Sequence, residues 1–225
     1  MARYKIAILI SGRGSNMAAL IEACRDEDYP AEVALVLSNR PDAPGLEIAQ
    51  AANIPTQVIE HGDFDSRELF DQAMTEVLTA SGVRLICLAG FMRLLSAEFC
   101  QRWRDSVINI HPSLLPAFKD MHVHERMLEA GVRIAGCTVH FVRPAMDEGP
   151  ILVQAAVPIA ADDTPESLAA RILHQEHRIY PLAVRLIAEG RARTAGGMVA
   201  IDNYELPEQV LINPPPELSR SKTPS

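Results

Sequence analysis

Asn109 and His111 have the residue types and the spacing of a catalytic pair. They stand two positions apart at the end of a predicted strand, so both side chains project to the same face of the sheet. An amide and an imidazole can both donate hydrogen bonds to an oxyanion, and an imidazole can also move protons near neutral pH. From spacing alone, the alternative is that both side chains only satisfy the backbone of the following loop.

A carboxylate that could act on His111 is Asp147, in the turn Asp-Glu-Gly-Pro at 147–150. An acid that faces a histidine stabilises its imidazolium form. The alternative is an acid solvated on a turn, which the composition of this segment favours. The residues alone leave both interpretations open.

A third motif, Ser-Gly-Arg-Gly-Ser-Asn at 11–16, connects the first predicted strand to the first predicted helix. Glycines there let the backbone approach an anion, and a helix N-terminus directs free N–H groups at it. Met17 replaces the third glycine of the dinucleotide fingerprint, and Ser-Asn-Arg at 38–40 lacks its acidic residue. We therefore expect a single phosphate here rather than a nicotinamide dinucleotide. A plain tight turn is the alternative, but it would not need the Ser, Asn and Arg side chains.

The remaining histidines do not complete a metal site in the sequence. His122 and His124 have the spacing of two ligands on a strand, but no third ligand is evident. The segment His-Gln-Glu-His at 174–177 matches neither His-Glu-x-x-His nor its inverted form. We expect no metal, although Glu176 and His177 could line a pocket from a helix.

The elements that must position these residues alternate between strands and helices in the first half of the chain. Strands are predicted at 5–10, 32–37, 85–89 and 106–110, and helices at 15–25, 46–52, 66–79 and 97–102. Ser66 is the expected N-cap of the third helix. Apolar runs separated by helices indicate parallel strands that are covered on both faces. Ligands bind at the carboxyl ends of such strands, where the motifs above lie.

The pattern changes in the second half of the chain. Strands are predicted at 137–142 and 151–158, joined by a turn short enough for antiparallel pairing, and a long helix at 165–188. A strand at 198–201 would add to one edge of the sheet. The sequence therefore predicts an α/β fold, a doubly wound, mostly parallel Rossmann-like sheet with an antiparallel C-terminal portion.

Composition narrows the class of protein. With 48% hydrophobic and 22% charged residues among 225, the chain can bury an ordinary core. Its net charge of −8 argues against a nucleic-acid-binding module, and its longest apolar run, 85–92, is too short to span a membrane. The four cysteines form no Cys-x-x-Cys pair, and no signal peptide is evident, so we expect a cytoplasmic protein. One domain is predicted over 1–205, followed by a flexible Pro- and Ser-rich tail over 206–225.

Four stretches make the sequence similar to a known family. They are Ser-Gly-Arg-Gly-Ser-Asn at 11–16, Leu-Ala-Gly-Phe-Met-Arg at 88–93, Asn-Ile-His-Pro-Ser-Leu-Leu-Pro at 109–116 and Gln-Glu-His-Arg-Ile-Tyr-Pro at 175–181. Together they resemble the folate-dependent formyltransferases, and among these the phosphoribosylglycinamide (glycinamide ribonucleotide) formyltransferases of de novo purine (IMP) biosynthesis. The resemblance extends from about residue 5 to about residue 201 and implies the formyltransferase fold.

The resemblance implies a reaction. The amine of glycinamide ribonucleotide would attack the formyl carbon of the co-substrate 10-formyltetrahydrofolate, giving formylglycinamide ribonucleotide and tetrahydrofolate. Asn109, His111 and Asp147 would be the catalytic residues. Asn109 would donate to the oxyanion, and His111, held protonated by Asp147, would supply a proton to the departing nitrogen. No metal would be needed, because the formyl group is already activated.

The resemblance also implies the binding residues and the partners. The ribonucleotide side would be formed by Gly14, Ser15, Asn16 and Glu176. The folate side would be formed by Arg67, Met92, Arg93, Leu94, Leu95, Arg143, Pro144, Ala145, Met146 and Asp147. The N-terminal half of the domain would face the ribonucleotide and the C-terminal half the folate. Both partners are small molecules, with no nucleic acid and no membrane, and a homodimer is left open.

One position departs from the family pattern, and three alternatives remain. Asp120 stands where the family usually has Gly, which would tolerate a positive φ at a lower cost. A formyltetrahydrofolate hydrolase usually carries an extra N-terminal domain, for which we expect no room before the first strand. An initiator-tRNA formyltransferase would need a second, RNA-facing domain and does not suit a charge of −8. A non-catalytic sensor would not need all three of Asn109, His111 and Asp147.

Overall fold

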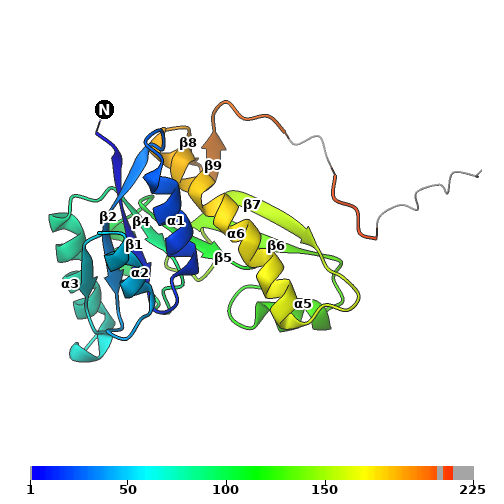
Figure 1. Ribbon diagram of the computed structural model, residues 1–225, viewed down its shortest axis with the longest axis horizontal. Coiled ribbons are helices and arrows are strands. Elements are labelled where there is room, and N and C mark those ends of the chain that lie inside the picture. Colours follow the sequence, from blue (N-terminus) through cyan, green and yellow to red (C-terminus); the bar gives the residue numbers. More distant parts are fainter. Residues whose placement is uncertain (1, 207–209, 215–225) are drawn as a thin grey trace, which may run out of the picture.

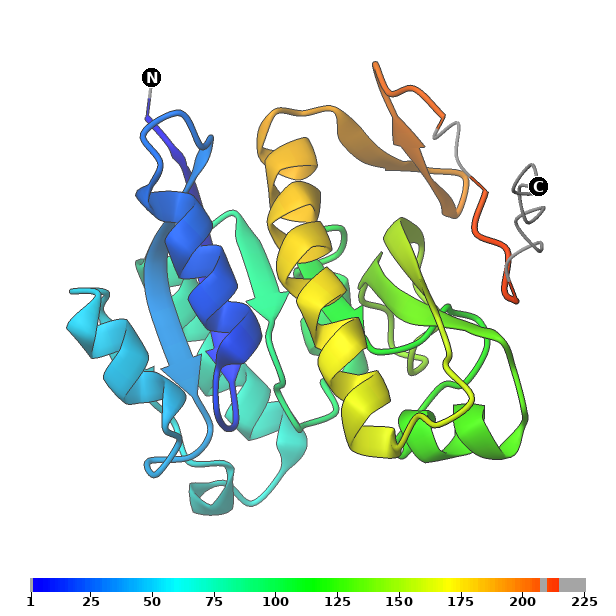
Figure 2. The same cartoon turned by 45° about the vertical axis from the view of Figure 1, so that its right-hand side comes forward.

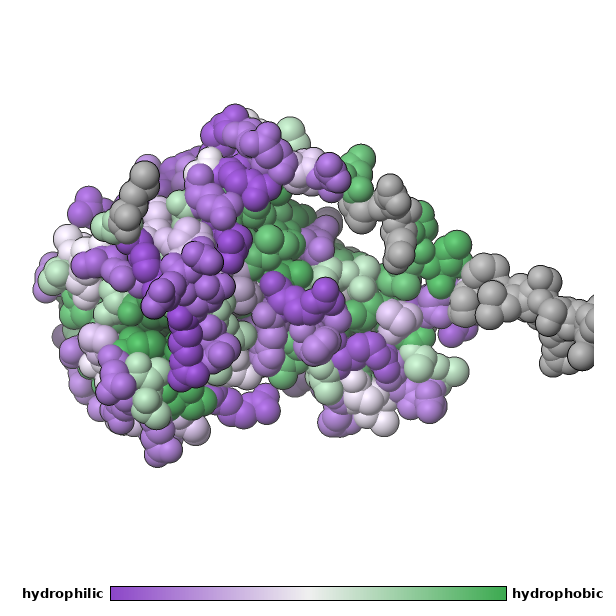
Figure 3. Space-filling view, turned by 45° about the horizontal axis from the view of Figure 1, so that its top comes forward, coloured by the Kyte–Doolittle hydropathy of each residue, from purple (hydrophilic) through white to green (hydrophobic). Residues whose placement is uncertain are grey.

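The computed structural model describes residues 2–206 and 210–214 (Figure 1). Most of the predicted tail, residues 207–209 and 215–225, therefore lies outside the described residues. In the described part of the tail, Asn213 donates from Nδ2 to the backbone oxygens of Arg133, at 2.6 Å, and Ile159, at 2.9 Å. Leu206, Val210 and Ile212 are exposed, and Figure 3 shows hydrophobic side chains gathered along this segment of a largely hydrophilic surface.

The regular elements agree closely with the alternating pattern of the sequence. The strands are β1 (Tyr4–Ile10), β2 (Ala31–Ser38), β3 (Thr56–Val58), β4 (Leu85–Leu88), β5 (Val107–His111), β6 (Ile134–Phe141), β7 (Ile151–Pro158), β8 (Ala192–Ala195) and β9 (Met198–Ile201). The helices are α1 (Ser15–Arg25), α2 (Gly45–Ala51), α3 (Arg67–Ala80), α4 (Ala97–Arg102), α5 (Val123–Glu129) and α6 (Pro165–Ala188), with a 3₁₀ turn, η1 (His61–Asp63). None of the described helices is long and apolar enough to cross a membrane.

The main sheet has seven strands in the order β3-β2-β1-β4-β5-β6-β7. The pairs from β3 to β5 are parallel, whereas β5 with β6 and β6 with β7 are antiparallel. The chain starts in the middle of the sheet, moves outward to β3 and returns to β4 beside β1. This reversal of direction lies between β1 and β4, and in open α/β sheets ligands bind outside the carboxyl ends of the strands at such a point. The predicted doubly wound sheet with an antiparallel C-terminal portion is confirmed.

Alternate side chains of β1 enter two different hydrophobic cores, one on each face of the sheet. Ile6, Ile8 and Ile10 pack into the core that α1 and α6 cover, whereas Ala7 and Leu9 pack into the core that α3 and α4 cover. A strand that is buried on both faces reads as a continuous apolar run, which is the pattern of residues 6–10. Figure 2 shows α1 and α6 side by side over one face.

Side chains cap the helices where the sequence predicts their starts. The Oγ of Ser66 accepts a hydrogen bond from the backbone N–H of Leu69 at 3.2 Å, so the predicted N-cap of α3 is present. At the start of α6, Thr164 and Ser167 bond reciprocally to each other's backbone N–H groups. Such caps satisfy donors that the first helical turn leaves without partners.

Three sequence predictions of elements were wrong or incomplete. The strand at 198–201 forms as β9, but it pairs with β8 in a separate hairpin and does not extend the main sheet. Gly196 and Gly197 both have positive φ and close this hairpin locally. Strand β6 begins three residues before the predicted start. A glycine weakens the sequence pattern of a strand, but Gly136 lies inside β6 against the backbone of β7, where a Cβ would meet the Ala155 oxygen at 2.0 Å. The short elements β3, α5 and β8 were missed.

Candidate active site

Strands β5 and β6 bring an amide and two imidazoles together. Asn109 pairs across the sheet with His140, and His111 pairs with Thr138. Directly opposed residues of an antiparallel pair lie on the same face, so Asn109 and His140 meet. The Nδ2 of Asn109 is 3.4 Å from the Nε2 of His140, which is only 2% exposed.

The carboxylate of Asp147 lies between the two histidines. Its Oδ2 is 3.5 Å from the Nδ1 of His111, and its Oδ1 is 3.7 Å from the Nε2 of His140. The Asp147 side chain is 8% exposed. The structure thus brings Asn109, His111 and Asp147 into one partly buried cluster, in the arrangement that the sequence motifs predict.

The polar neighbours of both His111 ring nitrogens suit an imidazolium. Its Nε2 lies 2.9 Å from the carbonyl oxygen of Phe118, which can only accept, so Nε2 carries the proton of this bond. Its Nδ1 faces the Asp147 carboxylate, which also accepts. A ring with an acceptor at each nitrogen is best satisfied when both nitrogens are protonated.

His140 is suited instead to the neutral form. Burial lowers the pKa of His140, and the Phe141 carbonyl and the Asp147 charge oppose this only in part. Its Nδ1 lies 3.1 Å from the Phe141 oxygen and must donate to it, so the Nε2 of the neutral ring accepts from Asn109. This bond orients the Asn109 amide and leaves its second N–H available. At 3.7 Å, the contact of Asp147 with a neutral His140 is not an ion pair.

The loop that carries Asp147 starts at the amino end of β5, the end opposite to His111, and returns from there. Because β6 runs antiparallel to β5, it ends at the amino end of β5, where the backbone N–H of Val142 bonds to the Val107 oxygen. The chain then folds back, and the N–H of Phe141 bonds to the oxygen of Pro150 at 2.9 Å. Gly149 lies so close to this point that a Cβ would be 1.5 Å from the Phe141 oxygen.

A second loop, 117–122, is fastened to the Asp147 loop. The backbone N–H of Asp120 donates to the Asp147 Oδ2 at 3.2 Å, and Lys119 forms an ion pair with Glu148 at 2.7 Å. Asp120 has φ 69°, the left-handed conformation that a glycine adopts more easily. The departure from the family pattern at this position therefore puts an aspartate where the backbone favours Gly, and a short polar side chain is among the few that tolerate it.

The motif at 11–16 forms the turn into α1. Gly14 has φ 73°, and a Cβ there would be 3.0 Å from the Cα of Gly45. Ser15 is the first residue of α1, and the first N–H groups of a helix have no partner within it. Asn16 donates from Nδ2 to the Oε2 of Glu176 at 2.7 Å.

Glu176 reaches this loop from α6, so the predicted ribonucleotide side draws on both halves of the chain. The residue is 6% exposed, and burial raises its pKa, against the opposing effects of the Asn16 hydrogen bond and the positive charge of His111. The structure therefore places the predicted phosphate loop and the cluster of Asn109, His111 and Asp147 on the same side of the molecule.

The predicted folate-side residues are divided among several places. Met92, Arg93 and Leu94 follow β4 with exposed side chains, and Leu95 is buried. Arg67 opens α3 and is exposed. Pro144, Ala145 and Met146 are exposed in the loop that leads to Asp147. Arg143 does not join them, because its guanidinium forms an ion pair with Asp105, at the amino end of β5.

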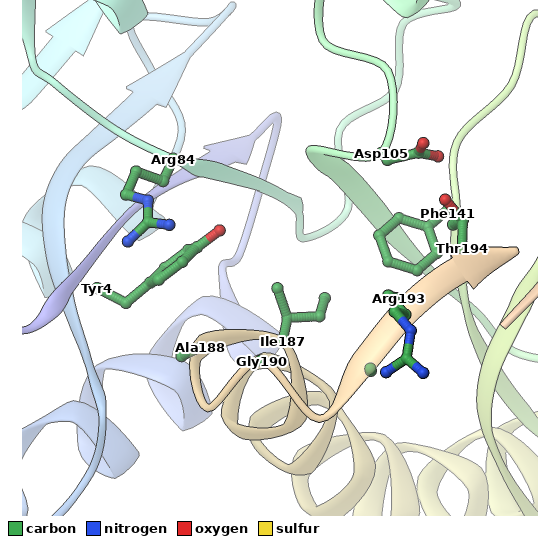
Figure 4. Close-up of a pocket in the computed structure, with 10 residues that line it drawn as sticks. Tyr4, Arg84, Asp105, Phe141, Ile187, Ala188, Gly190, Arg193 and Thr194 are labelled. Carbon is green, nitrogen blue, oxygen red and sulfur yellow. The ribbon is translucent and has the colours of Figure 1, made fainter. Parts of the chain in front are cut away.

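A cavity of about 310 Å³ lies away from these residues, at the amino ends of the strands. Figure 4 shows its lining, which includes Tyr4, Arg84, Asp105, Phe141 and Arg193. Asp105 is paired with Arg143, Arg193 is paired with Asp202, and the Arg84 guanidinium lies over the Tyr4 ring at 4.1 Å. The cavity contains none of the predicted site residues.

Comparison with known proteins identifies the family. The formyl transferase family model matches residues 4–184, which carry the seven strands of the main sheet, the loop at 11–16 and the cluster of Asn109, His111 and Asp147. The chain belongs to the formyl transferase family. This formyl transferase is 42% identical over 209 residues to the phosphoribosylglycinamide formyltransferase of Haemophilus influenzae. The matched region covers 93% of this chain and 99% of the relative.

Some relatives of this formyl transferase are much longer proteins, and others of similar length have solved structures. The trifunctional purine biosynthetic protein adenosine-3 of Gallus gallus is 49% identical over 188 residues, 84% of this chain, but the chain spans only 19% of that protein. The crystal structure of glycinamide ribonucleotide transformylase 1 from Symbiobacterium toebii superimposes with a TM-score of 0.86 at 48% identity, covering 88% of this chain and 94% of that one.

The residue that the sequence analysis of this formyl transferase missed is His140. The sequence does contain a matching pattern, because Thr138 and His140 stand two residues apart on β6, as Asn109 and His111 do on β5. The pairing of the two strands, and hence the contact between Asn109 and His140, depends on a register that spacing within one strand does not specify. Among the described residues, no group of three His, Cys, Asp or Glu side chains could hold a metal ion.

Proposed function

We propose that the protein transfers the formyl group of 10-formyltetrahydrofolate to the amine of glycinamide ribonucleotide. The products are formylglycinamide ribonucleotide and tetrahydrofolate, and the reaction is a step of purine biosynthesis. The observation that carries the proposal is the partly buried cluster of Asn109, His111 and Asp147 beside the predicted phosphate loop. The similarity over nearly the whole of the Haemophilus influenzae enzyme supports the same substrates.

Attack on the formyl carbon comes first in the proposed mechanism. The lone pair of the amine forms the new C–N bond, and the carbonyl π electrons move to oxygen, which becomes an oxyanion. The free N–H of Asn109 donates one hydrogen bond to it. The Nε2–H of His111, which the Phe118 oxygen otherwise accepts, exchanges that partner for the oxyanion and donates the second. Donors that are fixed in place before the reaction stabilise such a charge without a cost of reorganisation, and losing one costs about 10²–10³-fold in turnover.

Collapse of the tetrahedral intermediate completes the transfer. The oxygen electrons re-form the carbonyl, the bond from the formyl carbon to the folate nitrogen breaks, and that nitrogen takes a proton from His111. The proton released by the attacking amine restores the charge on His111. Asp147 keeps the imidazolium favourable throughout, and His140 stays neutral and holds the Asn109 amide in position.

Binding of the two substrates is assigned to opposite sides of this cluster. Gly14, Ser15 and Asn16 would hold the ribonucleotide phosphate with backbone N–H groups, with Glu176 beside them. The backbone of 92–95, Arg67 and residues 144–147 would border the folate. The Arg143 side chain would not, because it is paired with Asp105. An exposed Met92 suits such a site, because recognition there would use the backbone rather than the side chain.

A spectrophotometric assay with a 10-formyl folate, with and without glycinamide ribonucleotide, tests the proposal. Turnover only when the ribonucleotide is present supports it. Turnover with the folate alone would show a hydrolase, and no turnover in either case would show a sensor. Asn109→Ala and His111→Ala should each lose at least about 10²-fold in kcat. Near-wild-type turnover in both variants would overturn the mechanism.

A further inference from the structure

Ser11 connects two segments that the proposed function assigns to different substrates. It follows β1 and begins the phosphate loop, but one of its hydrogen bonds ends on the backbone of Met92. We propose that Ser11 is a positioning residue for the folate-side backbone at 92–95, although it belongs to the ribonucleotide loop. This inference rests on the proposed function, which assigns the two segments to the two substrates.

The direction of the Ser11 hydrogen bonds is set by their partners. The Oδ1 of Asn39 can only accept, so the Ser11 hydroxyl donates its proton to it, at 2.6 Å. The oxygen lone pairs then accept from the backbone N–H of Met92 at 2.8 Å. Ser11 is 6% exposed and Asn39 is 4% exposed, so water does not compete for these bonds. The hydroxyl is therefore a fixed acceptor for Met92.

A second side chain holds the other end of the same segment. The Oδ2 of Asp71, on α3, accepts from the backbone N–H of Ser96 at 2.6 Å. Asp71 is 3% exposed, and burial raises its pKa, against the opposing hydrogen bonds from Ser96. Buried acceptors thus hold the backbone N–H of Met92 and that of Ser96, the residue directly after this segment.

The side chains within the segment contribute little to this anchoring. Met92 is 71% exposed and Leu94 is 53% exposed, and only Leu95 is buried among them. A short backbone segment with two exposed apolar side chains has few packing contacts that fix its conformation. Its shape therefore depends on the two anchors, one of which is Ser11.

Ser11→Ala should accordingly act on the substrate that the Ser11 loop does not bind. We expect the KM for the formyl folate to rise about three- to tenfold, as the loss of one buried hydrogen bond predicts, with kcat within about twofold of wild type. The KM for the ribonucleotide should rise less. The amide hydrogen of Met92 should exchange faster by about the same factor as the folate KM rises.

Ser81→Ala is the matched control. It also removes a serine hydroxyl that bonds to backbone, the Val77 oxygen at 2.8 Å, but at the opposite end of α3 from Arg67. Its kinetic constants and the exchange of the Met92 amide should stay at wild-type values. If Ser11→Ala does not fold, Asn39→Ala replaces it, because it removes the acceptor that orients the Ser11 hydroxyl. It should raise the folate KM in the same direction.

The outcomes separate this inference from the proposed function. An unchanged folate KM, a rise confined to the ribonucleotide KM, or unchanged exchange of the Met92 amide would each overturn the role of Ser11. If the wild-type protein shows no ribonucleotide-dependent turnover, the proposed function fails. The exchange measurement does not need turnover, so faster exchange in Ser11→Ala would still support the anchoring of Met92.

Discussion

The proton positions in the catalytic cluster follow from which atoms can only accept. Phe118 offers a carbonyl oxygen to His111, and Phe141 offers one to His140, so each histidine must carry a proton on the nitrogen that faces it. Asp147 then meets the second nitrogen of His111, which is best satisfied when protonated, and the unprotonated nitrogen of His140. The position of the Asp147 carboxylate therefore suits a positive charge on His111 and a neutral His140.

Replacing Asp147 tests this assignment. Asp147→Asn keeps the size of the side chain but removes the negative charge that faces the Nδ1 of His111 at 3.5 Å. We expect kcat at neutral pH to fall at least about tenfold, because the charged donor at the oxyanion loses its partner. Steady-state kinetics with both substrates saturating measures this. A kcat within about twofold of the wild-type value would contradict the role of Asp147.

Replacing Gly14, with Gly12 as the control, tests whether the loop at 11–16 needs a glycine in the left-handed conformation. Gly14 has φ 73° and lies against Gly45, whereas a Cβ at Gly12 would meet nothing within 4 Å. Gly14→Ala should reduce the free energy of unfolding by about 1–3 kcal/mol and raise the KM for the ribonucleotide. Gly12→Ala, the control for stability, should change the free energy of unfolding by less than about 0.5 kcal/mol. Equal losses in urea unfolding would show that backbone conformation is not the cause.

At the scale of elements, α6 depends on an ion pair directly before its first turn. Arg171 donates two hydrogen bonds to the carboxylate of Asp163, at 2.6 and 2.8 Å, and Ser167 donates a third. These bonds, those from Arg171 above all, hold the pKa of Asp163 well below its usual range. Because the carboxylate is acidified on folding, it stabilises the folded state above its unfolded pKa, and this contribution is lost as the pH falls.

Asp163→Asn should therefore destabilise the protein in a pH-dependent way. We expect a loss of about 1 kcal/mol at pH 7, since Arg171 is one-third exposed and solvent screens the pair. The difference from wild type should narrow below about pH 4, where the carboxylate of the unfolded chain takes up a proton. Urea unfolding at pH 7, 4 and 3 measures it. Asp162→Asn is the control, and a difference that does not depend on pH would contradict the explanation.

The elements that the sequence predicted well are those whose signals are local. Helix α1 ends where its apolar spacing ends, and Ser66 caps α3 as its residue type indicates. The strands of the first half are buried on both faces, so their apolar runs are conspicuous. Strand β3 has three half-buried or exposed residues, and α5 starts after three left-handed residues within 118–122, so neither has a strong local pattern.

The candidate site was predictable only in part, for a related reason. Asn109 and His111 are neighbours in sequence, so spacing alone places them together. His140 and Ser11 act through partners far along the chain, and their roles depend on the pairing of β5 with β6 and on the return of the chain to β4 beside β1. Such contacts have no signature in a single segment of sequence.

At the scale of the whole molecule, the predicted site residues all precede the end of α6. The latest of them is Glu176, whereas the described part of the tail makes its hydrogen bonds through Asn213 to the ends of β6 and β7. The described part of the tail is therefore attached away from the residues of the proposed chemistry.

A chain that ends at Glu205 should keep its activity. We expect kcat and both KM values within about twofold of the full chain, and a loss of about 1–2 kcal/mol in the free energy of unfolding from the Asn213 hydrogen bonds. Asn213→Ala in the full chain separates this loss from any other effect of the tail. A drop in turnover of more than tenfold in the shortened chain would show that the tail contributes to the site.

The loop from Phe141 to Pro150 is closed at its base by the hydrogen bond between those two residues, with Gly149 packed against the Phe141 oxygen. Because the base is fixed, the number of residues between Phe141 and Asp147 sets the position that the carboxylate reaches. One residue more or fewer should move it away from His111. Insertions and deletions in this loop should therefore disturb the site more than substitutions of its exposed side chains.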